Sequence, residues 1–248
     1  MRLFNISLPS LFLSLGPSIE AAHLSVLSGG AIEPGLRYAA GAFEKATGHT
    51  VQITFNTAPQ IRTRIEAGER FDVLVAPQKL IAEFTKAGMV KEGGLVVGRV
   101  GSGVAVRPGA PLPEIASAGD IKKTVLKADS IVFNLASTGI YFENLLKNMG
   151  VWEEVEPKTT RYATGAEVMQ HALKGSGREV AFGPITEILL EKEHGLIFVG
   201  PLPPDVQNYT SYTAVPMSGS PRQDEAQALV EFLAGPEGKA LFVAAGIE

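Results

Sequence analysis

The chain has 248 residues, of which 45 % are hydrophobic and 19 % are charged, a composition typical of a globular protein and not of a disordered one. The formal net charge is −4 and the sequence contains no cluster of Lys and Arg, so nucleic acid is not an expected partner. With no cysteine, the chain has no disulfide, no thiolate zinc site and no cysteine nucleophile. The four histidines follow no metal-ligand spacing, and we expect neither a metal nor a cofactor.

The first 22 residues have the pattern of an export signal. Arg2 supplies a positive charge, and the mostly apolar run 3–15 is shorter than the roughly 20 residues that span a bilayer. We expect cleavage after Ala21 or Ala22, although Glu20 departs from a standard cleavage site. The alternative is a misassigned start or an unstructured tail. A signal peptide over 1–22 predicts a periplasmic protein.

Short apolar runs then alternate with segments of helical period. Residues 24–27, 51–55 and 72–76 have the pattern of strands. The expected helices cover 34–47, 59–67 and 79–87, and each ends at or next to a glycine. This alternation predicts a parallel sheet covered by helices.

A long β-rich stretch at 95–106 and a proline-rich segment at 201–204 are expected to cross between two lobes. We predict an α/β fold in which each lobe is a mostly parallel sheet covered by helices, joined by two crossing segments. The first lobe is expected to comprise 23–101 and 210–248, and the second 102–209. Between and after the crossings we expect strands at 130–134, 180–182, 196–199 and 210–215 and helices at 140–149, 167–174, 184–194, 222–233 and 236–243.

Three loops place small or polar residues just before an expected helix. They are 28–31, 56–58 and 137–139. A helix N-terminus presents unpaired backbone N–H groups and the positive end of a dipole, and it therefore attracts anions. Three such loops, each after a strand, predict a chain that closes around a small anionic solute.

Several segments resemble the molybdate-binding, periplasmic solute-binding proteins of ABC transporters. The segments are Phe43-Glu44-Lys45-Ala46-Thr47-Gly48, Ile65-Glu66-Ala67-Gly68 with Phe71-Asp72-Val73-Leu74-Val75-Ala76, Gly139-Ile140-Tyr141, Val180-Ala181-Phe182-Gly183 and Leu233-Ala234-Gly235-Pro236-Glu237-Gly238. The resemblance implies two lobes, a hinge of crossing strands, and closure around a ligand in the cleft. It also implies a transporter permease as partner, and we expect a monomer.

The resemblance places the family's ligand-binding hydroxyls on residues that lack them. The matched positions are Ala31, Ala58 and Phe182, whereas Thr138 and Thr164 match positions that donate backbone N–H groups. A hydrogen bond to a charged acceptor contributes about 1.5–3 kcal/mol, so these losses disfavour a tetrahedral oxyanion. The expected ligand-binding residues are Ser28, Gly29, Gly30, Ala31, Asn56, Thr57, Ala58, Ser137, Thr138, Thr164 and Phe182.

Backbone donors combined with apolar walls favour a small organic anion over a molybdate-like oxyanion, although both stay open. Arg62, Arg64 and Arg161 are alternative partners for a carboxylate. The leading function is an exported transport receptor without catalytic activity, because the matched residues offer no nucleophile or base. The alternatives are a cytoplasmic small-molecule sensor and an enzyme on the same scaffold.

Overall fold

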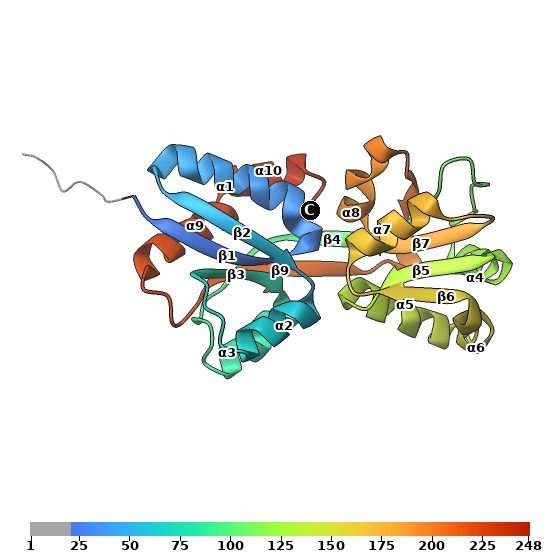
Figure 1. The fold of residues 1–248 in the computed structure, drawn as a ribbon, viewed down its shortest axis with the longest axis horizontal. Helices are drawn as coiled ribbons and strands as arrows, with labels where there is room; N and C mark the ends of the chain where they lie inside the picture. The colour runs from blue at the N-terminus through green and yellow to red at the C-terminus, as the bar shows by residue number, and fades with distance from the viewer. Residues whose placement is uncertain (1–20) are drawn as a thin grey trace, which may run out of the picture.

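The computed structural model describes residues 21–248, and the predicted signal peptide therefore lies almost entirely outside the described residues. Two α/β lobes lie side by side and are joined by two long strands (Figure 1). Within the described part of the chain, no helix has the length and apolar character needed to cross a membrane.

The first lobe is built on a sheet whose central strands are parallel. Strand β1 (His23–Gly29) pairs in parallel with β2 (Thr50–Asn56) and with β3 (Val73–Pro77), as the strand and helix alternation predicts. Strand β9 (Tyr209–Pro216) then adds to β3 in the antiparallel direction. The sheet is therefore mixed, with parallel and antiparallel pairs.

Helices cover both faces of this sheet. Leu24, Val26 and the buried side of α1 (Glu33–Thr47) share one core with α9 (Gln223–Ala234) and α10 (Pro236–Ala244). The opposite face packs against α2 (Ala58–Glu66) and α3 (Gln78–Lys86). The two C-terminal helices thus return to the first lobe, as expected.

The second lobe repeats this arrangement with shorter strands. Strand β5 (Ser130–Asn134) pairs in parallel with β6 (Thr159–Tyr162) and β7 (Glu179–Pro184), whereas β8 (Ile197–Pro201) pairs antiparallel with β4 (Leu95–Val106). Its helices are α4 (Ala118–Lys127), α5 (Ser137–Asn148), α6 (Trp152–Val155), α7 (Gly165–Lys174) and α8 (Ile185–Leu190). Helices α4, α5 and α6 cover one face, and α7 and α8 cover the other.

Strand β4 links the two sheets into one. Its residues Leu95–Gly101 pair with β9, and Ser102–Val106 pair with β7 and β8. The strand order is therefore β2-β1-β3-β9-β4-β7-β5-β6, with β8 on β4 outside this path. The chain passes between lobes along β4 and again at the start of β9 (Figure 1), and the residue boundaries given above for the lobes stay a prediction.

Candidate ligand-binding cleft

The ends of five strands meet in one small cavity between the lobes. Its lining includes the last residue of β1, β2, β3, β5 and β7, which are Gly29, Asn56, Pro77, Asn134 and Pro184. Ligands of open α/β sheets bind at the carboxyl ends of the strands. This inner cavity has a volume of about 30 Å³, and Gly30, Ala31, Thr57, Ala58, Ala136, Ser137, Thr138, Glu187 and Tyr212 complete its lining.

A second, larger cavity adjoins the inner one. It has a volume of about 260 Å³ and shares Gly30, Asn56, Thr57 and Glu187 with it. The other residues of this outer cavity are Glu33, Phe55, Gln60, Thr164, Gly165, Ala166, Leu190 and Glu191. Among the described residues, no Lys or Arg side chain belongs to the lining of either cavity.

The two cavities gather most of the residues that the sequence predicts to contact a ligand. The inner cavity takes in the loops 29–31, 56–58 and 137–138, and the outer cavity takes in Thr164. The three loops therefore converge in space, although they are far apart in the chain. Their contact with a ligand remains a prediction.

The start of α5 presents backbone donors to the inner cavity. The Asn134 side-chain oxygen accepts the backbone N–H groups of Ala136 and Gly139, both at 3.0 Å. Among residues 21–248, the N–H groups of Ser137 and Thr138 between them have no acceptor. Because these groups also lie at the positive end of the helix dipole, they are suited to an anionic oxygen.

The start of α2 is held by a capping box. The Gln60 side chain accepts the backbone N–H of Thr57 at 2.9 Å, and the Asn56 side chain donates to the same oxygen at 3.2 Å. The N–H of Ala58 has no acceptor within the described part of the chain. A second helix therefore also offers a free donor to the inner cavity.

Two predicted contact residues lie elsewhere. Ser28 is fully buried and its hydroxyl donates to the carbonyl of Gly29 at 3.1 Å, so it lies beneath the inner cavity and not on its wall. The Phe182 ring lies in the core of the second lobe and stacks on Phe142, with 3.7 Å between ring centroids. Both side chains pack within their own lobe, and neither lines the inner or the outer cavity.

The three candidate arginines are also engaged away from the cavities. Arg62 forms an ion pair with Glu83, and Arg161 forms one with Glu143. Arg64 pairs with Glu69 at 2.6 Å and also donates to the Asn56 side-chain oxygen at 2.7 Å. Arg64 thus positions a cavity residue without reaching the cavity itself.

Two titratable residues that line the inner cavity carry no signal in the sequence. Tyr212 lies on β9, and a β-carbon at Gly29 would come within 2.6 Å of its ring, so the glycine makes room for the tyrosine. Burial, and then the negative charge of Glu187, raises the pKa of the Tyr212 phenol. The lining therefore includes a hydroxyl from Tyr212 besides those of Thr57, Ser137 and Thr138, and is less apolar than the substitutions at Ala31 and Ala58 suggest.

Glu187 is the second of these residues and lies on α8. Burial, reinforced by the negative charge of Glu33, raises the pKa of its carboxyl to about 7. Its Oε2 atom is removed from solvent and has no hydrogen-bond partner among the described residues. The cleft therefore contains a group that gains or loses a proton near neutral pH.

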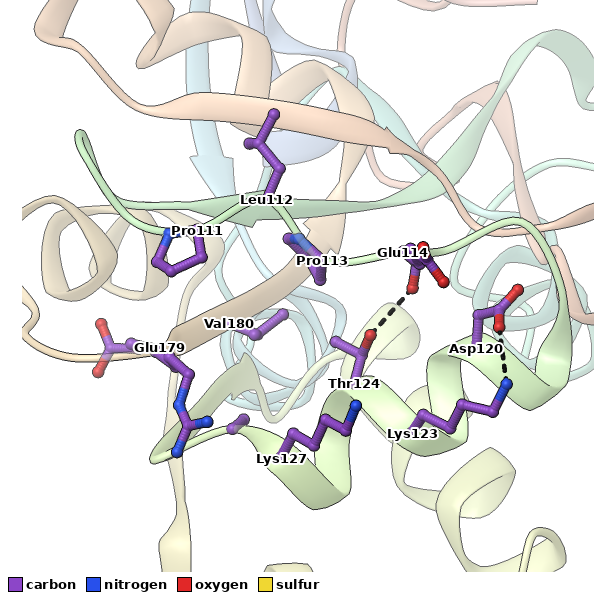
Figure 2. A pocket seen from close by; sticks show the side chains of 12 residues that line it. Pro111, Leu112, Pro113, Glu114, Asp120, Lys123, Thr124, Lys127, Glu179 and Val180 are labelled. Carbon is purple, nitrogen blue, oxygen red and sulfur yellow. Dashed lines mark hydrogen bonds and ion pairs between the residues drawn. The ribbon is translucent and has the colours of Figure 1, made fainter.

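Another cavity, of about 310 Å³, lies on the second lobe away from the cleft. Figure 2 shows it between the segment Pro111–Glu114, helix α4 and the start of β7. Two of its lining residues are hydrogen-bonded: the Thr124 hydroxyl donates to the Glu114 carbonyl at 2.9 Å. Because it contains none of the converging loops, we place the candidate site in the cleft.

The model of the family described as bacterial extracellular solute-binding protein matches residues 24–248. This chain belongs to that family. The match covers both lobes and the whole of the cleft.

Two curated proteins are similar along nearly all of the chain. One, named aconitate isomerase and from Pseudomonas sp., is 28 % identical over 95 % of this chain and 92 % of its own length. The other, the molybdate-binding protein ModA of Azotobacter vinelandii, is 26 % identical over 98 % of each chain. The solved periplasmic molybdate-binding protein of Azotobacter vinelandii has a TM-score of 0.75, at 16 % identity, over 91 % of this chain and 98 % of that chain. The fold predicted from the sequence is thereby confirmed.

Proposed function

We propose that this chain is an exported receptor that captures a small organic carboxylate between its lobes and delivers it to the permease of an ABC transporter. The observation that carries the proposal is the inner cavity, where free backbone N–H groups of α2 and α5 meet at the ends of five strands. This arrangement recognises an anionic oxygen without a basic side chain. The proposal includes export by residues 1–22 and action as a monomer.

The shape of the cleft favours a carboxylate over a tetrahedral oxyanion. The inner cavity has room for no more than one small group such as a carboxylate. The adjoining outer cavity of about 260 Å³ leaves room for the rest of an organic molecule. Ala31 and Ala58 provide no hydroxyl for a fully oxygenated ion. The relative named aconitate isomerase supports the same ligand class, because its name refers to an organic carboxylate.

Calorimetric titration tests the ligand class. The panel consists of malonate, succinate, citrate and the two aconitate isomers, set against molybdate, tungstate and sulfate. We expect binding of at least one carboxylate and weaker binding of the inorganic ions. Binding of molybdate with no binding of any carboxylate would refute this proposal.

A pair of variants tests the role of the outer cavity. Ala166 lies in the first turn of α7 and lines that cavity, so Ala166→Leu is expected to weaken the larger carboxylates more than malonate. Ala118 has a similar place at the start of α4, outside the cleft, and Ala118→Leu is the matched control. Equal effects of the two substitutions on citrate binding would contradict the location of the site.

A second candidate function is the isomerisation of an unsaturated carboxylate. It is favoured by Glu187, a carboxyl that exchanges its proton near neutral pH and lines both cavities. A positioned acid or base of this kind is what a proton-transfer reaction requires. Proton NMR of either aconitate isomer, incubated with the protein in D₂O, tests it: appearance of the other isomer supports catalysis, and an unchanged spectrum supports a receptor.

A further inference from the structure

Glu187 lies where the two lobes come together. A β-carbon at Gly30 of the first lobe would approach its Oε1 atom to 3.2 Å, and one at Gly165 of the second lobe would collide with its Oε2 atom. The absence of side chains at these two positions leaves the space that the carboxyl occupies. The two glycines therefore leave room for the Glu187 carboxyl between the first turn of the 3₁₀ helix Gly30–Ile32 and the first turn of α7.

Within residues 21–248, the carboxyl has no cationic partner in that place. Glu33 of α1, Glu191 just after α8 and the Tyr212 phenol line its cavities, while Glu167 of α7 accepts the N–H of Thr164. Of the basic residues on neighbouring elements, Arg37 pairs with Glu33 and His194 pairs with Glu191. Lys174 of α7 and Lys192, which follows Glu191, line neither cavity. On the strands that pack against α8, Arg99 pairs with Glu248, and Glu179 pairs with His171. The surroundings of Glu187 are thus neutral or negative.

We propose that Glu187 binds the ligand as a neutral carboxylic acid, donating a hydrogen bond to an anionic oxygen of the ligand, so that one proton is bound together with the anion. This inference rests on the proposed function, since it concerns the same cleft and an anionic ligand. It assigns to Glu187 a role in ligand recognition that its type does not suggest, because an ionised glutamate repels an anion.

The physical reason is the mutual repulsion of two buried negative charges. An anion in the inner cavity and an ionised Glu187 would face each other without a cation between them, which favours the protonated form of the glutamate. Protonation replaces this repulsion with a hydrogen bond to a charged acceptor. Because the pKa of Glu187 without ligand is already raised to about 7, protonating the carboxyl near neutral pH costs little free energy.

The sign of the pH dependence follows. Below a pH of about 6 the carboxyl is already protonated and the affinity is constant, provided that the ligand stays ionised. Above about pH 7.5, each unit of pH lowers the fraction of protonated Glu187 about tenfold, and the Kd rises by the same factor. A cationic ligand would have the opposite dependence.

Calorimetry of the whole protein with the carboxylates of the panel, from about pH 6.5 to about pH 8.5, tests this coupling. We expect the Kd of the wild-type protein to rise about tenfold per pH unit at the upper end. Repeating the titration in buffers of different ionisation enthalpy should reveal uptake of about one proton per ligand at the highest pH. This second measurement needs no variant and is therefore independent of any effect on folding.

Glu187→Gln keeps the shape and a donor but removes the titration. This variant should bind with the same affinity throughout the range, and more tightly than the wild type at the highest pH. Glu193→Gln removes the same charge from an exposed residue outside both cavities and should keep the wild-type slope. A wild-type affinity that is independent of pH or rises with pH would overturn the proposal, as would a retained slope in Glu187→Gln.

Molybdate, titrated in parallel, separates this inference from the proposed ligand class. If molybdate binds and no carboxylate does, the ligand class is wrong, and the slope for molybdate decides the role of Glu187 by the same criteria. If a carboxylate binds without proton uptake, the receptor function stands and the role of Glu187 is refuted. If neither anion binds, both are refuted.

Discussion

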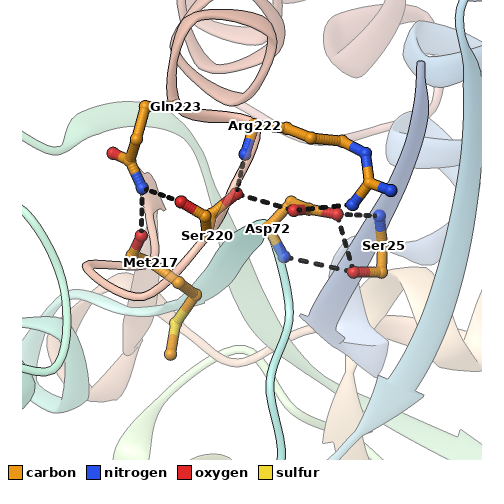
Figure 3. A network of polar contacts seen from close by, with 6 residues as sticks. All are labelled: Ser25, Asp72, Met217, Ser220, Arg222 and Gln223. Atoms are coloured by element: carbon orange, nitrogen blue, oxygen red, sulfur yellow. Dashed lines mark hydrogen bonds and ion pairs between the residues drawn. The ribbon is translucent and has the colours of Figure 1, made fainter.

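At the scale of single residues, Asp72 is a buried charge whose partners lie far apart in the chain. Figure 3 shows its carboxylate between Ser25 of β1 and Ser220 of the loop after β9. It accepts the backbone N–H and the hydroxyl of Ser25 at 2.8 and 2.9 Å, and the hydroxyl of Ser220 at 2.6 Å. Arg222 adds a longer ion pair at 3.6 Å. Asp72 therefore joins the start of the first lobe to the return of the chain from the second.

Burial alone would raise the pKa of Asp72, but the hydrogen bonds from Ser220 and Ser25 outweigh it and lower the pKa. Asp72→Asn is expected to lower the free energy of unfolding at neutral pH by about 2–3 kcal/mol, since it weakens several hydrogen bonds to a charged group. A lowered folded-state pKa stabilises the protein above the unfolded-state value of about 3.9 and ceases to do so as the pH falls through the folded-state value.

Urea denaturation at about pH 7 and about pH 3 measures this effect. The difference between wild type and Asp72→Asn should shrink at the lower pH. Glu92→Gln, which neutralises an exposed carboxyl, is the control and should change the stability by less than about 0.5 kcal/mol. A pH-independent difference for Asp72→Asn would contradict the role given to the charge.

The residues of the cleft differ in how far the sequence predicts them. The loops around Gly30, Thr57 and Ser137 each precede a helix, and local pattern is enough to find them. Glu187 and Tyr212 carry no such signal, because their orientation depends on how one lobe faces the other. The resemblance places Phe182 at a ligand-binding position, whereas the structure stacks its ring on Phe142 in the core of the second lobe.

At the scale of elements, helix α1 shows how one glycine is required and another is not. A β-carbon at Gly35 would collide with the Phe242 ring of α10 and come within 2.9 Å of Ile247, whereas one at Gly41 would meet nothing within 4 Å. Gly35 therefore sets the close approach of α1 and α10. Gly41 only adds conformational freedom to the unfolded chain.

The two alanine substitutions in α1 should act in opposite directions. Gly35→Ala is expected to destabilise the protein by about 1–3 kcal/mol through overpacking. Gly41→Ala is expected to stabilise it by about 0.5–1 kcal/mol. Alanine lowers the conformational entropy of the unfolded chain, and its methyl group would contact no other residue in the folded protein. Thermal and urea unfolding of both variants measures the effects. Equal effects would indicate that α1 and α10 are not packed in this way.

Besides the four-residue helix α6, two elements of the second lobe are absent from the sequence prediction, for physical reasons. Helix α4 buries only Ile121, Thr124 and Val125, so its apolar stripe is short among charged residues. Strand β6 has four partly buried residues at the sheet edge and takes its direction from pairing with β5. Long-range pairing, which no local pattern encodes, creates such a strand. The helices and strands with a longer apolar period were predicted within a few residues of their observed ends.

At the scale of the whole molecule, the two lobes are connected through β4 and β9 and also touch across the cleft. The buried hydroxyl of Thr186, on α8 of the second lobe, donates to the carbonyl of Ala31 in the first lobe. This hydrogen bond lies beside Glu187 and the inner cavity. Because it joins the two lobes across the cleft, we expect this hydrogen bond to favour a closed form over an open one.

Thr186→Val replaces the hydroxyl with a methyl group of similar size. Loss of a hydrogen bond worth about 0.5–1.5 kcal/mol should shift the unliganded protein toward the open form and weaken ligand binding by about two- to tenfold. Small-angle X-ray scattering should report a larger radius of gyration without ligand and the wild-type value at saturation.

Thr213→Val is the matched control, because the buried Thr213 hydroxyl has no hydrogen-bond partner within residues 21–248. Removing this hydroxyl should leave ligand binding unchanged and the stability of the protein equal or higher. If Thr186→Val changed stability alone, with the same scattering and the same affinity as the wild type, the contact between Thr186 and Ala31 would be a packing feature and not part of closure.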